Sequence, residues 1–435
     1  MREIYPYMTK SIRRLDTLFL CTPIGLGLYL GLIAPVHSAP YASGVSFQGT
    51  TVNFTLNEPA DVVAISINGG SFSLLDGGTK GLKTFNLGSA SDTFSIAVYN
   101  NDPVGYTIPT GNVINPAASG LSQATAEGGF NLLSIDTDPL VRFNSPRGVT
   151  VATNPNNPQF GTSYISNSAS GTTTVRSLGD GLYGLKADQS DAFGYGDSAV
   201  SLGFETGTPS ASSPFRITIG GDHNVYVADW SDAYGGVYRV SPTLLAPTQI
   251  LAGVGGPGTL PVGQNHGSIS AVHVTGTASG LTVYTVDEDL TSSQFGGAST
   301  TDKNSLWQYD VGNSALPYDG TPTKLSGALL NIAGVVNDMD RGANGYFYLS
   351  QFRQNGLEGG IIVLDANGSV LFNSLTESRT LLGDPLAPDI FRNVQAIALS
   401  LDQTYLAAML NNSDVAILPL ANGIPLLANR MVINT

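Results

Sequence analysis

The sequence contains a single cysteine, Cys21, among its 435 residues. It lies in an N-terminal segment that we expect to be removed, which would leave a mature chain without disulfides, thiolate nucleophiles or cysteine-ligated zinc. Stability must then come from the size of a hydrophobic core, for which 42% hydrophobic residues are ample. The scarcity of cysteine therefore excludes a disulfide-stapled fold and cysteine chemistry.

Charged residues are also scarce, at 12% of the chain, where about 25% is typical. Long surface helices depend on Glu, Lys and Arg, so this scarcity disfavours a helical protein. The charges that are present are mostly acidic, with 33 Asp and Glu against 19 Lys and Arg. A chain with a net charge of −14 and no basic run repels a phosphate backbone, and we expect no nucleic-acid partner.

Several signatures of catalysis are missing. The sequence has no G-x-S-x-G elbow, no P-loop and no HExxH motif. Beyond the N-terminal segment the histidines are His223, His266 and His273, and three histidines without cysteine are weak evidence for zinc. The catalytic residues of an enzyme are therefore unknown from the sequence, and the balance favours a protein without enzymatic activity.

The first 38 residues have the pattern of an export signal. Lys10 and two arginines precede an apolar stretch, Leu18–Ala34, and compact residues near Ser38 suit cleavage after that position. We therefore expect residues 1–38 to be a signal peptide. The mature chain would be periplasmic, cell-surface or extracellular and would not span a membrane; a retained membrane anchor is the alternative.

Residues 45–100 contain short stretches in which apolar and polar side chains alternate. Thr51–Leu56 and Val63–Ile67 have this period of two, and the turn signal Asn68-Gly69-Gly70 follows the second. Such strands predict a small β-sandwich. The run FTLNEPADVVAISINGG and the following GGTKGLKTFNLG resemble the immunoglobulin-like domain of flagellar hook-capping proteins, which implies an accessory module without an active site. Residues 101–143, rich in Pro, Gly, Asn and Ala, are expected to be a linker or a partial blade.

From Ser145 onward the chain repeats a pattern of strands about every 60 residues. A first strand is followed by a second strand with an aromatic residue and then by a third, which in the first repeat is expected at Thr173–Val175. Two repeats begin with Ser-Pro, at Ser145 and Ser213. The first strands are expected at Arg147–Val151, Phe215–Ile219, Ser270–Val274, Asn337–Arg341 and Gln395–Leu399.

Four-stranded units that recur in this way are typical of a β-propeller, because one unit buries too little apolar surface to be stable alone. We therefore predict an all-β chain in which residues 144–435 form a multi-bladed β-propeller after the immunoglobulin-like sandwich. Five four-stranded repeats are countable. Whether five blades close a ring within this chain stays open.

The phrase DHNVYVADWSDAYGGVYRVSP, at residues 222–242, resembles the NHL, YVTN and gluconolactonase-like propellers. Gluconolactonase-like enzymes hold a metal with Glu, Asn and Asp side chains near the ring axis. The resemblance thus makes Asp229, Asp287 and Asn337 candidate ligands of Ca²⁺, which prefers hard oxygen ligands. The matching glutamate at the start of the first repeat is missing, and an aspartate that ends a strand often only caps a turn. No other cofactor is expected.

In a propeller the starts of the first strands and the ends of the second strands lie on one rim. Asp338–Gly345 has some features of a calcium loop but lacks its glutamate, so it predicts a turn between strands. The candidate binding residues of the rim are Arg147, Asn167, Arg216, Asp229, Trp230, Asp287, Asn337, Gln351 and Gln395.

Together these features predict an exported binding or interaction scaffold whose partner is a glycan, a peptide or a cell-surface protein. The alternative is a calcium-dependent hydrolase of the lactonase or esterase type with its site on the propeller axis.

Overall fold

The structure is a computed structural model that describes most of the chain from residue 40 onward. The predicted signal peptide, residues 1–38, and the greater part of the predicted linker, residues 101–138, lie outside the described residues. The chain divides into two compact units, of which the first contains residues 40–99 and the second contains all other described residues. The described ranges are 40–99, 139–173, 176–196, 213–230, 236–251, 269–287, 305–325, 335–352, 359–411 and 414–433.

The first unit consists of two three-stranded antiparallel sheets. One has the order β1 (Ala42–Gln48), β2 (Thr51–Leu56), β5 (Gly81–Asn86), and the other β4 (Ser73–Leu75), β3 (Val62–Ile67), β6 (Phe94–Tyr99). Their alternating apolar side chains meet in one core, with Phe54 and Phe85 from the first sheet against Ile65 from the second. This is a β-sandwich, as the period of two predicts; the immunoglobulin-like resemblance stays a prediction.

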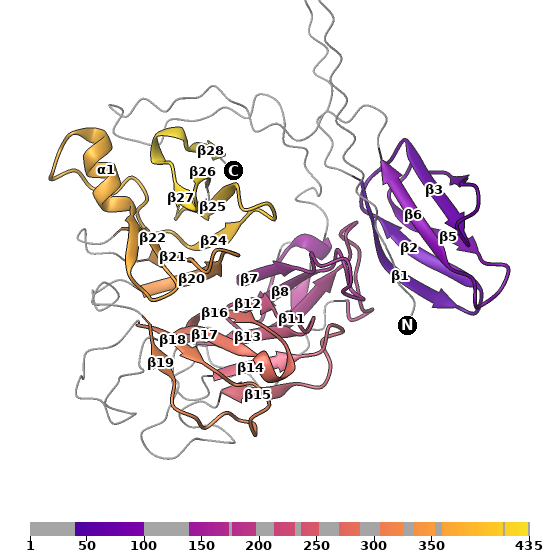
Figure 1. The fold of residues 1–435 in the computed structure, drawn as a ribbon, viewed down its shortest axis with the longest axis horizontal. Coiled ribbons are helices and arrows are strands. Elements are labelled where there is room, and N and C mark those ends of the chain that lie inside the picture. The colour runs from indigo at the N-terminus through magenta and orange to yellow at the C-terminus, as the bar shows by residue number, and fades with distance from the viewer. Residues whose placement is uncertain are drawn as a thin grey trace, which may run out of the picture. The chain divides into compact units, whose positions relative to one another are not determined.

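In the second unit, the described strands form five larger antiparallel sheets that follow one another along the chain (Figure 1). Within a sheet the strands pair in chain order, except that the last strand of the fifth sheet pairs with its third. Two short strands, β9 (Gly171–Thr172) and β10 (Ser177–Leu178), pair only with each other. The five sheets are β7 (Pro146–Val151), β8 (Ser163–Asn167), β11 (Gly181–Leu185); β12 (Ile217–Ile219), β13 (Val225–Asp229), β14 (Gly236–Val240), β15 (Thr248–Leu251); β16 (Ile269–Thr275), β17 (Thr282–Asp287), β18 (Ser305–Tyr309), β19 (Thr323–Lys324); β20 (Val335–Arg341), β21 (Phe347–Phe352), β22 (Ile361–Leu364), β23 (Val370–Asn373); and β24 (Ala396–Leu399), β25 (Tyr405–Met409), β26 (Val415–Ala421) with β27 (Ile424–Pro425) and β28 (Met431–Ile433).

These sheets are arranged as the blades of a β-propeller. The first strands contact one another in succession, β7 with β12, β12 with β16, β16 with β20 and β20 with β24. A separate apolar core fills each of the four interfaces between successive sheets. Inner strands side by side and apolar contacts between blade faces confirm the predicted all-β propeller fold.

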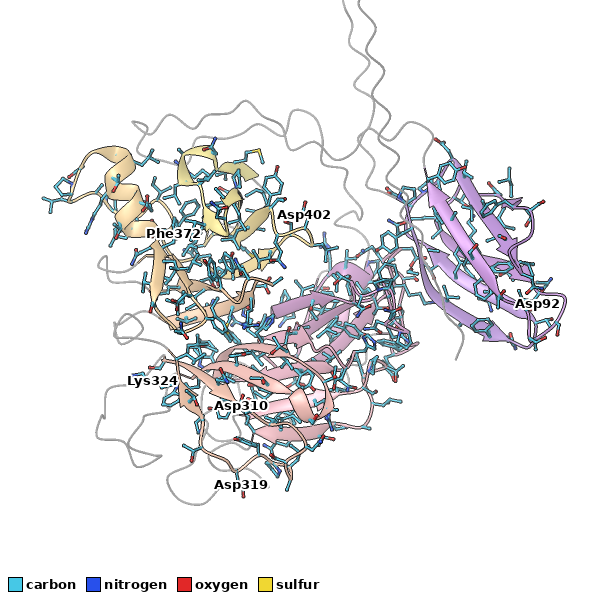
Figure 2. The ribbon with its side chains drawn as sticks, in the orientation of Figure 1. Asp92, Asp310, Asp319, Lys324, Phe372 and Asp402 are labelled. Atoms are coloured by element: carbon cyan, nitrogen blue, oxygen red, sulfur yellow. The ribbon has the colours of Figure 1, made fainter. Side chains whose placement is uncertain are left out.

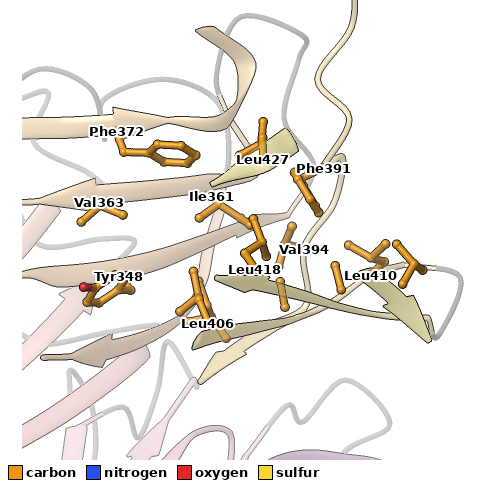
Figure 3. Close-up of a cluster of buried hydrophobic side chains, with 14 residues drawn as sticks. Tyr348, Ile361, Val363, Phe372, Phe391, Val394, Leu406, Leu410, Leu418 and Leu427 are labelled. Atoms are coloured by element: carbon orange, nitrogen blue, oxygen red, sulfur yellow. The ribbon is translucent and has the colours of Figure 1, made fainter. Parts of the chain in front are cut away.

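The core between the fourth and fifth sheets illustrates this packing (Figure 3). Phe372 and Ile361 of the fourth sheet lie against Leu418 of the fifth. The single α-helix of the described residues, α1 (Ser374–Leu382), follows the fourth sheet. It begins at Asn373, whose side chain accepts a hydrogen bond from the amide of Leu375, 3.0 Å away.

In the first and fourth blades, the second-strand tyrosine donates a hydrogen bond to the next blade. The Tyr164 hydroxyl donates to the Pro242 carbonyl at 2.6 Å, and the Tyr348 hydroxyl to the Gly423 carbonyl at 2.8 Å. Each acceptor lies just beyond the third strand of the next sheet. The Tyr226 hydroxyl instead donates to Asp222 of its own blade at 2.9 Å, while its side chain packs in the core between the second and third sheets.

One strand prediction is wrong, and another is confirmed. The third strand of the first sheet is β11, where Leu182, Tyr183 and Leu185 supply the buried side chains, and not the predicted Thr173–Val175. Residues 174 and 175 of that prediction lie outside the described residues. The predicted first strand Asn337–Arg341 is confirmed as part of β20, where buried Met339 lies between two strand-paired aspartates. The turn predicted for Asp338–Gly345 begins only after Arg341.

Much of the acidic charge is on surface turns. Asp310, Asp319 and Asp402, which are labelled in Figure 2, are exposed. Such dispersed carboxylates keep a protein soluble and do not form a site by themselves. The described residues include no helix long and apolar enough to cross a membrane.

Candidate functional site: the axial rim of the propeller

Four of the candidate residues occupy the same place in successive blades. Asn167, Asp229, Asp287 and Gln351 each follow the second-strand tyrosine by three residues and lie at or near the end of that strand. Asn167, Asp229 and Gln351 are buried, and the side chain of Asp287 lies outside the described residues. The sequence thus places these four correctly at the ends of the second strands, but the buried side chains of Asn167, Asp229 and Gln351 do not line an open rim.

Asn167 and Asp229 form hydrogen bonds with residues at the start of their own blades. Asn167 accepts a hydrogen bond from the amide of Ser145 at 2.8 Å, and its amide group donates to two nearby carbonyls. Asp229 accepts one from the hydroxyl of Ser213. Both serines belong to the repeated Ser-Pro pairs. The repeat is therefore explained by a structural contact between the end of the second strand and the start of the first.

The first-strand residues, in contrast, converge on one side chain, that of Arg216. Its guanidinium donates to the backbone carbonyls of Arg147, Asn337 and Gln395, which come from the first, fourth and fifth sheets. The bond to Asn337 is 2.6 Å long. The Asn337 side chain adds a 3.1 Å bond to the Gln395 carbonyl. We call this group the axial cluster, because it joins the first-strand ends of four blades around one guanidinium.

Asp338 provides the carboxylate of the axial cluster. Its Oδ1 lies 3.7 Å from Nε of Arg216, and its Oδ2 accepts a 3.1 Å bond from the amide of Ile397. Burial lowers the pKa of Arg216 and raises the pKa of Asp338, while their mutual attraction opposes both shifts. The pair is therefore an ion pair held inside the propeller, with 9% and 18% of the two side chains exposed.

A second pair, His273 on β16 and Asp340 on β20, lies two residues further along β20 than Asp338. His273 Nδ1 is 3.6 Å from Oδ1 of Asp340, whose Oδ2 accepts a 2.8 Å bond from the amide of Leu399. Burial, with a contribution from the charge of Arg341, lowers the pKa of His273 to about 4. His273 is thus neutral at physiological pH. Sequence reasoning missed this pair, although Asp-Met-Asp on a strand already puts both carboxylates on one face.

The side chains that remain open to solvent lie beside the axial cluster. Arg147 is exposed, and its guanidinium lies 5.9 Å from the ring centre of Phe215. Trp230 is half-buried and packs against Phe215, and the centres of the two rings are 4.6 Å apart. Gln395 is partly exposed and donates to Oδ1 of Asn411 at 3.0 Å. These are the groups through which the rim can contact a ligand.

The residues of the axial cluster do not fit a calcium ion. The three carbonyls that would be hard-oxygen ligands already accept hydrogen bonds from Arg216, whose positive charge would repel a cation. Asn337 bonds to Gln395 and Arg216, whereas Asp229 bonds to Ser213. Within the described residues no group of three acidic, histidine or cysteine side chains is placed to hold a metal.

No protein-family model and no curated protein matches the chain. Among solved structures, the chain is similar to a gluconolactonase from Xanthomonas campestris, with 12% identity over 60% of this chain and 69% of that chain and a TM-score of 0.34. It is also similar to an auxiliary nutrient-binding protein from Bacteroides ovatus, with 10% identity over 92% and 87% of the two chains and a TM-score of 0.38. A protein of unknown function from Bacteroides thetaiotaomicron is 12% identical over 90% and 86%, with a TM-score of 0.40. Similarities this low assign no function, which must be argued from the site.

Proposed function

We propose that the protein is an exported β-propeller that binds an extracellular ligand at the rim around the axial cluster and catalyses no reaction. The observation that carries the proposal is the Arg216 guanidinium, which joins the first-strand ends of four blades. It makes the rim a rigid platform and takes the oxygen atoms that a catalytic cation would need. Export rests on the sequence pattern of residues 1–38.

A rigid platform favours binding because little conformational freedom is lost when the ligand arrives. The polar groups of the axial cluster already have partners, so the contacts left for a ligand are those of Arg147, Trp230 and Gln395. None of these is a nucleophile. A glycan, a peptide or a loop of a cell-surface protein could contact such a surface.

The experiment is a calorimetric melt of the mature chain (residues 39–435) with a panel of soluble oligosaccharides and peptides. A ligand at a hundredfold excess over its Kd stabilises the native state by about 2.7 kcal/mol. We expect at least one ligand to raise the melting temperature of the wild type but not that of the double variant Arg147→Gln/Trp230→Ala. Calcium-dependent hydrolysis of lactones or esters that Asp229→Ala abolishes would overturn the proposal in favour of the hydrolase.

A further inference from the structure

We propose that the ligand of the rim is an acidic sugar, with Arg147 binding its carboxylate and Trp230 stacking on its ring. This inference rests on the proposed function and narrows it to one ligand class. It starts from a contrast between two arginines that share Phe215: Arg216 is saturated by protein acceptors, and Arg147 is not.

Arg147 is held in position but keeps donors for a ligand. Its Nε donates to the hydroxyl of Ser168 at 3.2 Å, and Ser168 in turn is 3.1 Å from the hydroxyl of Ser145. The face of the guanidinium lies against Phe215. These contacts leave the two terminal nitrogens of an exposed side chain without an acidic partner among the described residues. Two parallel N–H donors on a fixed plane match the two oxygens of a carboxylate.

The surroundings of Arg147 make an anion the favoured partner. The second guanidinium, that of Arg216, lies 4.8 Å from the centre of the same phenyl ring and is near enough to Arg147 for their charges to repel. Asp338 offsets the charge of Arg216, and the buried carboxylate of Asp229 lies next to Trp230 in the chain. The net charge of −14 is spread over the chain, and salt screens exposed charges beyond roughly 8–10 Å. Of these four charged groups only Arg147 is exposed, so the charge that a ligand meets here is positive.

Trp230 favours a sugar over a peptide as the carrier of the carboxylate. Its indole packs against Phe215 at 4.6 Å and 54° and remains half-exposed. Because Trp230 and Arg147 both contact Phe215, a short saccharide can reach both at once. An indole face binds the C–H side of a sugar ring, while the guanidinium binds the carboxylate of a uronate residue.

The test is isothermal titration of the mature chain with a trigalacturonate and, separately, with the neutral trigalactose of the same length. We expect the acidic sugar to bind more tightly, with an affinity that falls as NaCl rises. Arg147→Gln should weaken uronate binding roughly tenfold or more and leave neutral sugar unaffected. Arg147→Lys should recover only part of the loss, since an ammonium cannot form the paired bonds. Trp230→Ala should weaken both ligands.

The matched control is Arg379→Gln, which removes the same charge from helix α1 on the outside of the propeller. It should bind the uronate as tightly as the wild type. Equal binding by wild type and Arg147→Gln, or failure of the wild type to bind trigalacturonate, would overturn the inference. Binding of the neutral sugar or of an acidic peptide that is as tight as that of trigalacturonate, and that Trp230→Ala weakens, would overturn the acidic sugar but keep the rim as a binding site. Calcium-dependent turnover would instead overturn the proposed function itself.

Discussion

Replacing Arg216 by methionine should destabilise the propeller more than replacing any exposed arginine. Methionine keeps much of the length of the side chain but removes its charge and all its donors. The carbonyls of Arg147, Asn337 and Gln395 would lose their common partner, and Asp338 would lose its counter-charge. Buried polar groups without partners are costly, so the loss exceeds that of the hydrogen bonds alone.

The magnitude follows from two observations that give similar values. A hydrogen bond to a charged group contributes about 1.5–3 kcal/mol, and three such bonds are lost here, although the contributions of neighbours do not add fully. Removing one partner of a buried ion pair costs about 3–5 kcal/mol. We therefore expect Arg216→Met to lower the free energy of unfolding by about 4 kcal/mol, which is a large share of a typical stability.

Urea denaturation followed by tryptophan fluorescence is the suitable assay. Both tryptophans of the chain, Trp230 and Trp307, belong to the propeller, so their signal does not report on the sandwich. The control Arg379→Met removes one hydrogen bond, from Nε to the Ala387 carbonyl, and should cost about 1 kcal/mol. A loss below about 1 kcal/mol for Arg216→Met would refute the reasoning, because it would mean that the axial cluster does not hold the blades together.

Two further substitutions test other parts of the account. Asp389→Asn should lower the free energy of unfolding by about 2–4 kcal/mol in the same urea assay, because the buried carboxylate accepts four hydrogen bonds. The donors are Gly360 N, Ser374 Oγ, Ser378 Oγ and Phe391 N. A loss near zero would contradict that role. His273 should make stability fall as pH falls from about 6.5 to about 4, because its pKa is lowered to about 4 in the fold and the unfolded chain takes up the proton first. The loss is about 3 kcal/mol at most, and the His273→Gln variant should lack it; parallel stability curves for wild type and variant between pH 4 and 7 would contradict the expectation.

The repeat of strands could be predicted because each blade carries its own local pattern. Alternating apolar residues and the second-strand tyrosine mark every unit, and Tyr164 and Tyr348 indeed join neighbouring blades. The first blade departed from the pattern, since its third strand lies further along the chain at Gly181–Leu185. The local sequence does not favour Gly181–Leu185 over the predicted Thr173–Val175. The third strand is identified by its pairing with β8.

The candidate site could be predicted only in part. The sequence identified the first-strand residues Arg147, Arg216, Asn337 and Gln395, and the structure brings them together. It could not show that Arg216 is the centre, because two of the three acceptors are backbone atoms from sequence positions more than a hundred residues away. Backbone carbonyls carry no signature in a sequence, and their convergence depends on the curvature of the whole set of blades.

For the polar residues at the ends of the second strands, the sequence predicted the positions but not the roles. Asn167 and Asp229 are polar and recur in register, which favoured a binding role. Their partners, Ser145 and Ser213, lie within the same blade and explain the recurrence without a ligand. Only contacts can separate a polar residue that fastens a blade from one that faces a ligand. The roles of Asp229, Asp287 and Asn337 as calcium ligands therefore depend on experiment.

The most direct test of this interpretation is the melting temperature of residues 39–435 in EDTA and then in millimolar calcium. Because Arg216 already supplies the positive charge of the axial cluster, we expect the same melting temperature in both conditions, for the wild type and for Asp229→Ala alike after allowance for the variant's own stability. A calcium-dependent rise in the wild type that Asp229→Ala and Asp287→Ala remove would contradict the account and place a metal at the propeller axis.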